Sequence, residues 1–249
     1  MTKVFVHGNP ETGAIWGPLV RELSSRGITD VVLLSPPGFG APVPAGWGAT
    51  QGEYREWLLG QLSHINGPVD LVGHDWGAGH VFGALATQPG LVRTWAADCA
   101  GLMHPDYVWH DAARTWQTPE AGEESVAGLS AMGADAFAAV FGALGMGEEV
   151  AHSVGGHVNE QMARCILALY RSAAQPAMSR LGEAFRAAAP ARGLVVIAEN
   201  DHFAGTAQMH SEVAAWTGAD TVHLPGVGHW WMTENPRAAA DALTSHWAG

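Results

Sequence analysis

Short apolar runs alternate with longer amphipathic segments along most of the chain. The longer segments have helical spacing and lie at about 14–26, 50–64, 76–88, 206–217 and 235–247. Apolar runs that are each followed by a helix are typical of a parallel sheet buried on both faces. We therefore predict an α/β fold with a mainly parallel six-stranded sheet, right-handed crossovers and helices on both faces. The predicted strands are Lys3–His7, Asp30–Leu34, Val69–Gly73, Val92–Cys99, Gly193–Glu199 and Thr221–Leu224.

One long segment interrupts this alternation. Between about Leu102 and Phe185 there is no strand-like run, only Ala-rich and Met-bearing stretches with helical spacing. Connections in such sheets usually span about two to six residues, so a segment of this length has a role of its own. We predict an inserted helical cap at 102–185, and an α/β core made of 1–101 and 186–249.

The third predicted strand, Val69–Gly73, runs into a turn that carries a candidate nucleophile. The turn and its flanks read Gly-His-Asp-Trp-Gly, with Asp75 at the centre. Gly73 and Gly77 allow the sharp strand-to-helix turn of a nucleophile elbow, which lifts the central side chain above the sheet. The helix N-terminus there favours an ionised carboxylate. The simpler reading is an Asp that caps the helix, but partners elsewhere in the chain favour the nucleophile.

These partners follow in the order nucleophile, acid, base that is used by this architecture. Asp201 comes directly after the fifth predicted strand, and His229 lies in Gly-Val-Gly-His-Trp-Trp after the last one. An acid that orients a histidine base is the arrangement that nucleophilic catalysis requires. The turn His7–Pro10 follows the first strand and supplies an oxyanion site, with the backbone N–H groups of Asn9 and Trp76 as donors.

Together these motifs resemble the α/β-hydrolase family, in its branch with an aspartate nucleophile: epoxide hydrolases, haloalkane dehalogenases and haloacetate dehalogenases. The resemblance covers essentially the whole chain. The chain begins at the strand before the oxyanion turn, so we expect the N-terminal antiparallel strands of the family to be missing. Five motifs in family order carry the resemblance: His7-Gly-Asn-Pro10, Ser35-Pro-Pro-Gly-Phe-Gly40, Gly73-His-Asp-Trp-Gly77, Glu199-Asn-Asp-His-Phe203 and Gly228-His-Trp230.

An aspartate nucleophile restricts the reaction. Attack of a carboxylate on an ester carbonyl would give a mixed anhydride, which gains little. Attack of Asp75 on a saturated carbon gives an alkyl ester, which a water activated by His229 can then hydrolyse. We therefore expect a substrate with a strained ring or a good leaving group on saturated carbon, which describes an epoxide or an alkyl halide.

The residues that would assist the leaving group keep both substrates open. The resemblance to epoxide hydrolases implies two cap tyrosines that donate protons to the ring oxygen. Tyr170 matches the later tyrosine, but the earlier position holds Ala112, and Tyr107 is out of register. The second donor is therefore absent or replaced by another cap side chain, namely Trp109, His110 or Trp116.

The resemblance to one subfamily of dehalogenases implies instead that Asn9 and the Trp76 indole hold the leaving halide. That subfamily takes its acid after the fourth strand, where this chain offers only Asp98, one place out of register. Asp201 and the Gly-His-Trp pattern favour hydrolysis of an epoxide to a vicinal diol, with haloalkane or haloacetate dehalogenation as the alternative. A third possibility is a non-catalytic small-ligand-binding protein of the same fold, since fold does not fix function. The complete set of Asp75, Asp201 and His229 favours an enzyme.

Aromatic residues indicate the class of ligand, and composition restricts the classes of partner molecule. Trp109, His110, Trp116 and Trp230 predict an apolar, partly aromatic pocket for a hydrophobic small molecule. The chain carries 12 Lys+Arg against 24 Asp+Glu, a formal net charge of −12, and has no basic run. This charge excludes nucleic acid as a partner, because phosphate backbones are repelled.

The remaining features concern compartment and cofactors. No apolar run is long enough to span a membrane, and the N-terminus lacks the features of a signal peptide. We expect a cytoplasmic protein, monomeric or homodimeric, that has no membrane partner. Cys99 and Cys165 are expected to be buried thiols of a reducing compartment. The 13 histidines show no metal-ligand spacing, so we expect neither a metal nor a cofactor.

Overall fold

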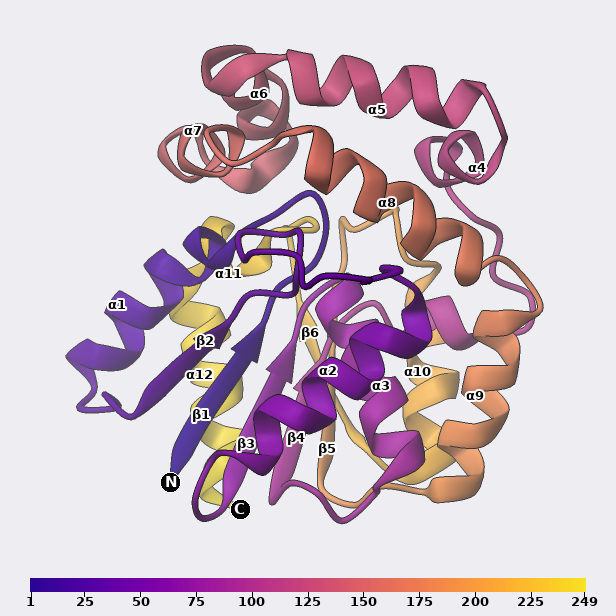
Figure 1. Cartoon of the computed structure of the whole chain (residues 1–249). Coiled ribbons are helices and arrows are strands. Elements are labelled where there is room, and N and C mark those ends of the chain that lie inside the picture. The colour runs from indigo at the N-terminus through magenta and orange to yellow at the C-terminus, as the bar shows by residue number, and fades with distance from the viewer.

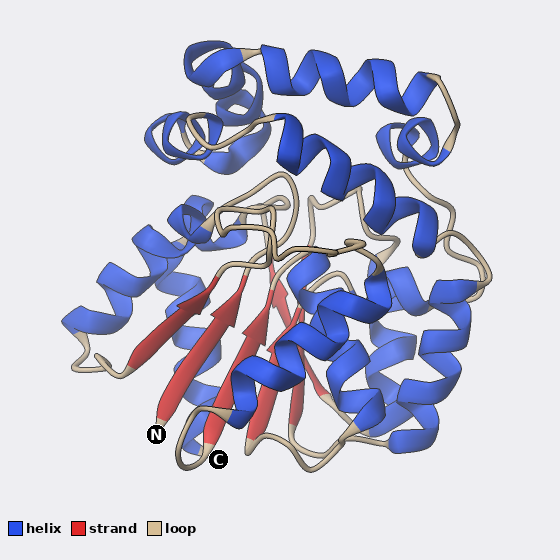
Figure 2. Ribbon diagram, in the orientation of Figure 1, coloured by secondary structure: helices blue, strands red, loops and turns tan.

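The computed structural model describes residues 1–249, which form one six-stranded sheet in which all paired strands are parallel. The predicted fold class is confirmed (Figure 2). β4 is shorter than predicted, because Cys99 adopts a left-handed φ of 50° that turns the chain out of the sheet. The strands are β1 (Thr2–Val6), β2 (Val31–Leu34), β3 (Val69–Gly73), β4 (Thr94–Ala97), β5 (Gly193–Ala198) and β6 (Asp220–Leu224).

The strand order β2-β1-β3-β4-β5-β6 decides where a ligand can bind. Winding of the chain reverses at β1, because β2 lies on one side of it and β3 on the other. Ligands of open α/β sheets bind in the crevice at the carboxyl ends of the strands where this reversal occurs. Val6 pairs with Gly73 at that edge, so the turn after β1 and the turn after β3 lie side by side.

Helices cover both faces of the sheet (Figure 1). Successive side chains of a strand point to opposite faces, so Val4 and Val6 belong to one buried apolar cluster and Phe5 to the other. The Phe5 side is covered by η1 (Gly13–Trp16), α1 (Gly17–Ser25) and α12 (Pro236–Ala248). The opposite side is covered by α2 (Gln51–Ser63), α3 (Trp76–Thr87), α9 (Ala177–Ala188) and α10 (Ala207–Thr217).

A layer of helices lies over the carboxyl ends of the strands (Figure 1). We call α4 to α8 the helical layer. Asn159 caps the N-terminus of α8, because its side chain accepts hydrogen bonds from the backbone N–H groups of Gln161 and Met162. α4 and α5 pack along α8. The elements of the helical layer are α4 (Asp111–Gln117), α5 (Ala121–Ala131), α6 (Gly133–Phe141), η3 (Gly142–Met146), α7 (Glu148–Gly155) and α8 (Glu160–Ser172).

α9 falls largely within the segment 102–185 that the sequence assigns to the cap, but it does not belong to this layer. It packs along α3 beside the sheet, and the ring of Phe185 lies edge-on to Phe82 and Trp95, with centroids 5.2 and 5.5 Å apart. The part of the segment that lies over the strand ends therefore stops at α8. Two short elements, η2 (Ala100–Met103) and α11 (Trp231–Glu234), complete the chain.

Two further expectations concern cysteines and membranes. Cys99 and Cys165 are both buried and free, as predicted. No single helix combines the length and the apolar character needed to cross a membrane, although the bent pair Ala121–Ala131 and Gly133–Met146 reaches that mark when its two parts are taken together.

Candidate active site

Asp75 occupies a strained turn between β3 and α3. Its backbone has φ 52° and ψ −122°, a region that a non-glycine residue adopts only when the surrounding structure enforces it. Close packing provides that force. A Cβ atom at Gly77 would lie 2.1 Å from the carbonyl oxygen of Val6, and one at Gly73 would lie 2.7 Å from the Cα of Ala78. Both glycines of the predicted elbow are therefore required by the close approach of helix and strand.

The Asp75 carboxylate is held by the turn after β1. The backbone N–H of Asn9 donates to Oδ1 at 2.8 Å, and the backbone N–H of Trp76 also donates to the carboxylate. A Cβ atom at Gly8 would lie 2.1 Å from the same Oδ1, so only glycine leaves room there. Burial raises the pKa of Asp75 to about 6, although the nearby His229 favours the ionised form.

His229 lies between Asp75 and Asp201. Its Nδ1 is 2.8 Å from Asp201 Oδ2, and its Nε2 is 3.8 Å from Asp75 Oδ2. The backbone N–H of Phe203 donates to Asp201 Oδ1 at 2.8 Å and fixes the carboxylate. Burial lowers the pKa of His229, but the Asp201 carboxylate outweighs it and the net pKa is raised to about 9. The structure thus brings together the three residues that the sequence predicts as nucleophile, acid and base.

Tyr170 enters from α8 and meets the two predicted leaving-group donors. Its hydroxyl lies 3.5 Å from Asn9 Nδ2, and the Trp76 indole also interacts with the hydroxyl. The Tyr170 ring stands edge-on to the Trp76 ring, with centroids 5.1 Å apart. Burial raises the pKa of Tyr170 well above its ordinary value, so the hydroxyl keeps its proton at neutral pH.

A cavity of about 180 Å³ lies above these groups, between the strand ends and the helical layer. The predicted pocket residue Trp109 does not line it, because its ring stacks behind Trp76 at 6.0 Å and 22°. The other predicted pocket residues do. The lining consists of Asn9, Pro10, Asp75, His110, Ala112, Trp116, Phe141, Leu144, Tyr170, Phe203, His229 and Trp230.

Of the side chains considered as a second donor, His110 alone offers an unspent N–H to the cavity. Its Nδ1 accepts from the backbone N–H of Ala113 at 3.3 Å, so the neutral ring carries its proton on Nε2. Burial lowers the pKa of His110 to about 4, which keeps the ring neutral at pH 7. The Trp116 indole is engaged with Ser125 Oγ at 3.2 Å, and the Tyr107 hydroxyl with the Phe203 carbonyl at 2.7 Å.

A buried group that no sequence pattern predicts lies beneath the site. Glu11 and Asp98 flank the His74 ring, with Glu11 Oε1 3.0 Å from Nε2 and Asp98 Oδ2 bonded to Nδ1. Asp98 is therefore the hydrogen-bond partner of His74, and Asp201 is the hydrogen-bond partner of His229. One signal in the sequence could have identified Glu11, since it is a carboxylate directly after the turn His7–Pro10. Its side chain is wholly buried.

Two sets of side chains have donor atoms within 4.8 Å of one another, as a metal ion would need. They are Glu11, His74 and His229, and Cys99, Asp201 and His229. Both nitrogens of His74 are bonded to carboxylates, and His229 Nδ1 is bonded to Asp201. Hydrogen bonds within the protein therefore account for these ring nitrogens, and a metal would have to displace them.

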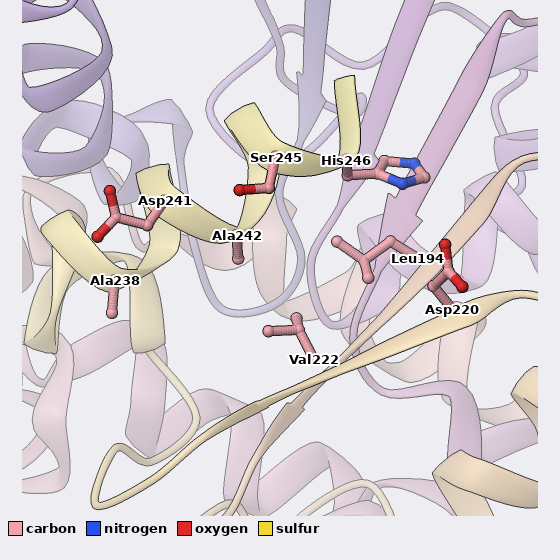
Figure 3. Close-up of a pocket in the computed structure, with 8 residues that line it drawn as sticks. All are labelled: Leu194, Asp220, Val222, Ala238, Asp241, Ala242, Ser245 and His246. Carbon is pink, nitrogen blue, oxygen red and sulfur yellow. The ribbon is translucent and has the colours of Figure 1, made fainter. Parts of the chain in front are cut away.

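A second hollow, of about 500 Å³, lies between α12 and the edge strand β6 (Figure 3). It sits near the amino ends of β5 and β6, away from the strand ends where ligands of open α/β sheets bind. Two of its polar side chains are already engaged, because Asp241 pairs with Arg26 at 2.6 Å and His246 lies 3.1 Å from the Trp95 carbonyl. This groove is not the candidate active site.

Comparisons with known proteins agree with this architecture. The chain resembles the solved structure of a haloalkane dehalogenase DbeA-M1 loop variant from Bradyrhizobium elkanii, with 21% identity, a TM-score of 0.73, and coverage of 99% of this chain and 90% of that one. It also resembles the Cif epoxide hydrolase from Acinetobacter nosocomialis, with 18% identity, a TM-score of 0.75, and coverage of 99% and 82%. E-2-(acetamidomethylene)succinate hydrolase is similar too, with 20% identity, a TM-score of 0.72, and coverage of 100% and 91%.

These likenesses establish the fold that the three hydrolases share with this chain. A search of curated protein sequences finds no match. The model of the alpha/beta hydrolase family matches residues 4–242, which is nearly the whole chain. The protein therefore belongs to the alpha/beta hydrolase family.

Proposed function

We propose that the protein is an epoxide hydrolase that works through an Asp75 alkyl-enzyme ester and converts a small hydrophobic epoxide into a vicinal diol. The observation that carries this choice is the environment of Tyr170. Its hydroxyl oxygen lies 3.5 Å from the Asn9 amide nitrogen, and the Trp76 indole also interacts with the hydroxyl. The donors that a leaving halide would need are thus used to hold a tyrosine, whose own proton remains free for the cavity.

In the first half-reaction Asp75 Oδ2 attacks a ring carbon of the epoxide. The carbon–oxygen bond of the ring breaks, and Tyr170 gives its proton to the departing oxygen. The Nε2–H of His110 donates a second hydrogen bond to that oxygen, in the role that Ala112 cannot fill. The product is a hydroxyalkyl ester of Asp75 together with a buried tyrosinate, which the raised pKa of Tyr170 makes a strong base.

The second half-reaction is hydrolysis of the ester, with His229 as base. In the resting enzyme Asp75 and Asp201 both favour the charged form of His229. Ester formation removes the charge of Asp75, so the pKa of His229 falls and the ring releases its Nε2 proton to solvent. The neutral Nε2 can then accept a proton from the attacking water, and the ring takes its proton back from solvent once Asp75 is ionised again. Asp201 holds the Nδ1–H and keeps Nε2 directed at the ester.

The oxyanion of this step develops on the Asp75 carbonyl oxygen. Oδ1 already accepts from the backbone N–H of Asn9, and the backbone N–H of Trp76 also acts on the carboxylate. These donors support the negative charge as water adds. Collapse of the intermediate releases the diol oxygen, which takes the proton from His229. The carboxylic proton left on Asp75 restores the Tyr170 hydroxyl, so the sum is epoxide plus water to diol.

Cavity size and lining narrow the substrate. About 180 Å³ is below the roughly 300 Å³ at which pockets for drug-sized ligands begin. The walls include the rings of Trp116, Phe141 and Phe203, which favour an apolar or aromatic substituent. We therefore propose short-chain or monoaromatic epoxides such as styrene oxide.

Dehalogenation remains a second candidate because one observation favours it. The side-chain amide of Asn9 and the indole of Trp76 both lie at the Tyr170 hydroxyl. If Tyr170 moved away from them, the two groups could hold a halide ion as the carbon–halogen bond breaks. The intact mass of the covalent intermediate separates the two reactions.

The test uses His229→Gln, in which Asp75 can still attack but water is no longer activated. We expect the ester to accumulate with styrene oxide and to add the full mass of the epoxide, because the ring oxygen stays attached. With 1-bromobutane an adduct would add only the alkyl group less a proton. Intact-mass spectrometry measures both, and Asp75→Asn in the same background should abolish every adduct.

A matched control replaces a histidine outside the site. His104 pairs with Glu212 at 2.8 Å on the flank of the fold, so His104→Gln should turn substrate over without accumulating ester. An adduct that survives Asp75→Asn would contradict the aspartate nucleophile. An adduct from 1-bromobutane and from no epoxide would reverse the order of the two reactions, and specific binding with no adduct from either class would indicate a binding protein.

Tyr170→Phe sharpens the same test. Loss of the proton donor should slow ester formation from epoxides by roughly 10²- to 10⁴-fold, the usual contribution of general acid catalysis. Hydrolysis of a preformed ester should change little, because His229 and Asp201 remain. Single-turnover measurements of the two steps check this, and equal slowing of both steps would argue against Tyr170 as the donor.

A further inference from the structure

We infer that His74 is a permanently charged imidazolium that positions the two catalytic turns and sets the basicity of His229, as the centre of a buried ion triad with Glu11 and Asp98. The kinetic part of this inference rests on the proposed function. The structural part does not. His74 is the residue before Asp75, so its backbone is part of the same elbow.

The geometry requires both ring nitrogens of His74 to be protonated. Glu11 Oε1 is 3.0 Å from Nε2, and Asp98 Oδ2 is bonded to Nδ1. An ionised carboxylate only accepts hydrogen bonds, so a neutral ring would set one of its lone pairs against a carboxylate. The His74 ring is wholly buried, and the rings of Trp16 and Trp231 lie edge-on to it at 6.1 and 6.4 Å. Water therefore cannot screen the charges.

The two carboxylates of the triad bind the catalytic turns in matching ways. Glu11 accepts from the backbone N–H of Gly8 at 2.7 Å and from the Trp230 indole at 2.6 Å. Asp98 accepts from the backbone N–H of Asp75 at 2.9 Å and from the Trp231 indole at 2.6 Å. Glu11 therefore holds the turn whose backbone donates to the Asp75 carboxylate, and Asp98 holds the turn that carries Asp75. Each carboxylate also holds one of the two tryptophans that come after His229.

His74 also acts on His229 through space. The ring centroids are 4.6 Å apart, and one nitrogen of each ring lies within 4.8 Å of a Glu11 oxygen and of the other nitrogen. The titratable groups that face His74 are Glu11, His7, Asp75, Asp98, Asp201 and His229. Those that face His229 are Asp201, Asp75, Glu11, Asp98, His74 and His110.

Most charged neighbours of His229 are carboxylates, which favour its charged form. His74 is the one cation among them and lowers the pKa of His229. A base must be neutral to accept a proton from water, so the His74 charge opposes the carboxylates at the step that needs a free Nε2. The charges of Glu11, His74 and Asp98 sum to −1, and this sum gives the inference a sign that can be tested.

Two variants change that sum in a controlled way. His74→Gln removes one positive charge and should raise the pKa of His229 by on the order of 1 pH unit or more, as expected for a charge within about 5 Å in a weakly screened interior. The double variant Glu11→Gln/His74→Gln restores the sum to −1 and should return the pKa of His229 toward its wild-type value. A purely structural role predicts the opposite order, with the double variant more perturbed than the single one.

The measurement is ¹⁵N NMR of the histidine-labelled full chain, from pH 6 to 10. In the wild type, His74 should keep protons on both ring nitrogens at pH 8. His80, which is equally buried but has no hydrogen-bond partner, should be neutral because burial lowers its pKa to about 3. The same spectra follow the titration of His229 in each variant. Where an ester forms, the rise of its hydrolysis rate with pH should move upward in His74→Gln and return in the double variant.

The control removes a buried carboxylate from an ion cluster at the other end of the sheet. Asp70→Asn should lower stability and leave the titration of His229 unchanged. An unprotonated nitrogen on wild-type His74 at pH 8 would overturn the inference, as would an unchanged His229 pKa in His74→Gln. If that single variant fails to fold, the wild-type spectrum still decides the charge of His74. Failure to form any ester would contradict the proposed function alone, since the NMR titrations need no substrate.

Discussion

The two ends of the sheet each bury an ion cluster, and the clusters differ in their cations. At the amino end Asp70 accepts from Lys3, from Arg93 at 2.7 Å and from Thr94 at 2.6 Å. The Lys3 ammonium also lies 4.5 Å above the Trp247 ring. At the carboxyl end the cation is His74, between Glu11 and Asp98. Lysine and arginine keep their charge throughout the pH range of folding, whereas histidine keeps its charge above neutral pH only where neighbouring carboxylates hold the proton.

The two clusters also differ in which parts of the chain they hold together. The amino-end cluster joins β1, β3 and the start of β4 through side chains of the strands themselves, so its charges serve the packing of the sheet. The carboxyl-end cluster uses residues that follow those same strands, and its partners are backbone N–H groups of the turns around Asp75. A single type of substitution, Asp to Asn, can test this division at both ends.

The largest effect is expected for Asp201→Asn. The neutral amide no longer fixes the tautomer of His229 or supports its charge, so ester hydrolysis should slow by roughly 10²- to 10⁴-fold. Ester formation should slow less, because Asp75 attacks without His229. Rapid-quench measurement of both steps checks this. If Asp98→Asn rather than Asp201→Asn slowed hydrolysis selectively, the acid would be the wrong one.

The next effect is expected at the amino end, for Asp70→Asn. The side chain is fully buried, and removing one partner leaves Lys3 and Arg93 without their counter-charge. Breaking such a buried pair costs about 3 kcal/mol, while kcat should stay near the wild-type value because the cluster is remote from the cavity. Urea unfolding and a turnover assay measure the two quantities.

The pH dependence of that loss has a definite sign. Burial acts to raise the pKa of Asp70, but Arg93, Lys3 and Thr94 outweigh it and the net pKa is lowered. The stabilisation is therefore complete above the unfolded pKa and disappears as the pH falls through the folded one. The gap between Asp70→Asn and wild type should close in acid, and a gap that widened there would contradict the assignment.

The smallest effect is expected for the stability of Asp75→Asn. The folded pKa of Asp75 is raised from 3.8 to about 6, so the ionised carboxylate destabilises the fold. That cost is absent below about pH 4 and complete above about pH 6. Asp75→Asn should therefore be more stable than wild type at pH 8, by at most the roughly 3 kcal/mol to which this shift corresponds, and equal to it near pH 4. Thermal melts at both pH values test this, and lower stability at pH 8 would show that the site stabilises its charge.

The sheet and the three predicted catalytic residues could be found from the sequence because their signals are local. An apolar run of about five residues predicts a strand without knowledge of its neighbours. Gly73 and Gly77 flank Asp75 within one turn, and the close contacts that they permit explain why glycine is present. Asp201 and His229 each follow a strand, and parallel strands bring their carboxyl ends to one edge.

The triad of Glu11, His74 and Asp98 could not be found in this way. Its members follow three different strands, and they meet because β1, β3 and β4 are adjacent in the sheet. No spacing along the chain encodes that order. The same limit applies to Trp109, whose place behind Trp76 depends on how the helical layer is seated. It applies to α9 as well, whose amphipathic pattern fits a cap and a sheet flank equally well.

The cavity is formed by two parts of the fold, the turns of the sheet and the helical layer. The groups proposed for ester hydrolysis, Asp75, Asp201 and His229, stand on turns of the sheet and are anchored from below. The groups that meet the leaving atom, Tyr170 and His110, come from α8 and from the N-cap of α4 in the helical layer. Substitutions in that layer can therefore alter which bond is broken while the hydrolytic step is inherited intact. Under the proposed function, bond breaking and ester hydrolysis therefore depend on two different parts of the fold.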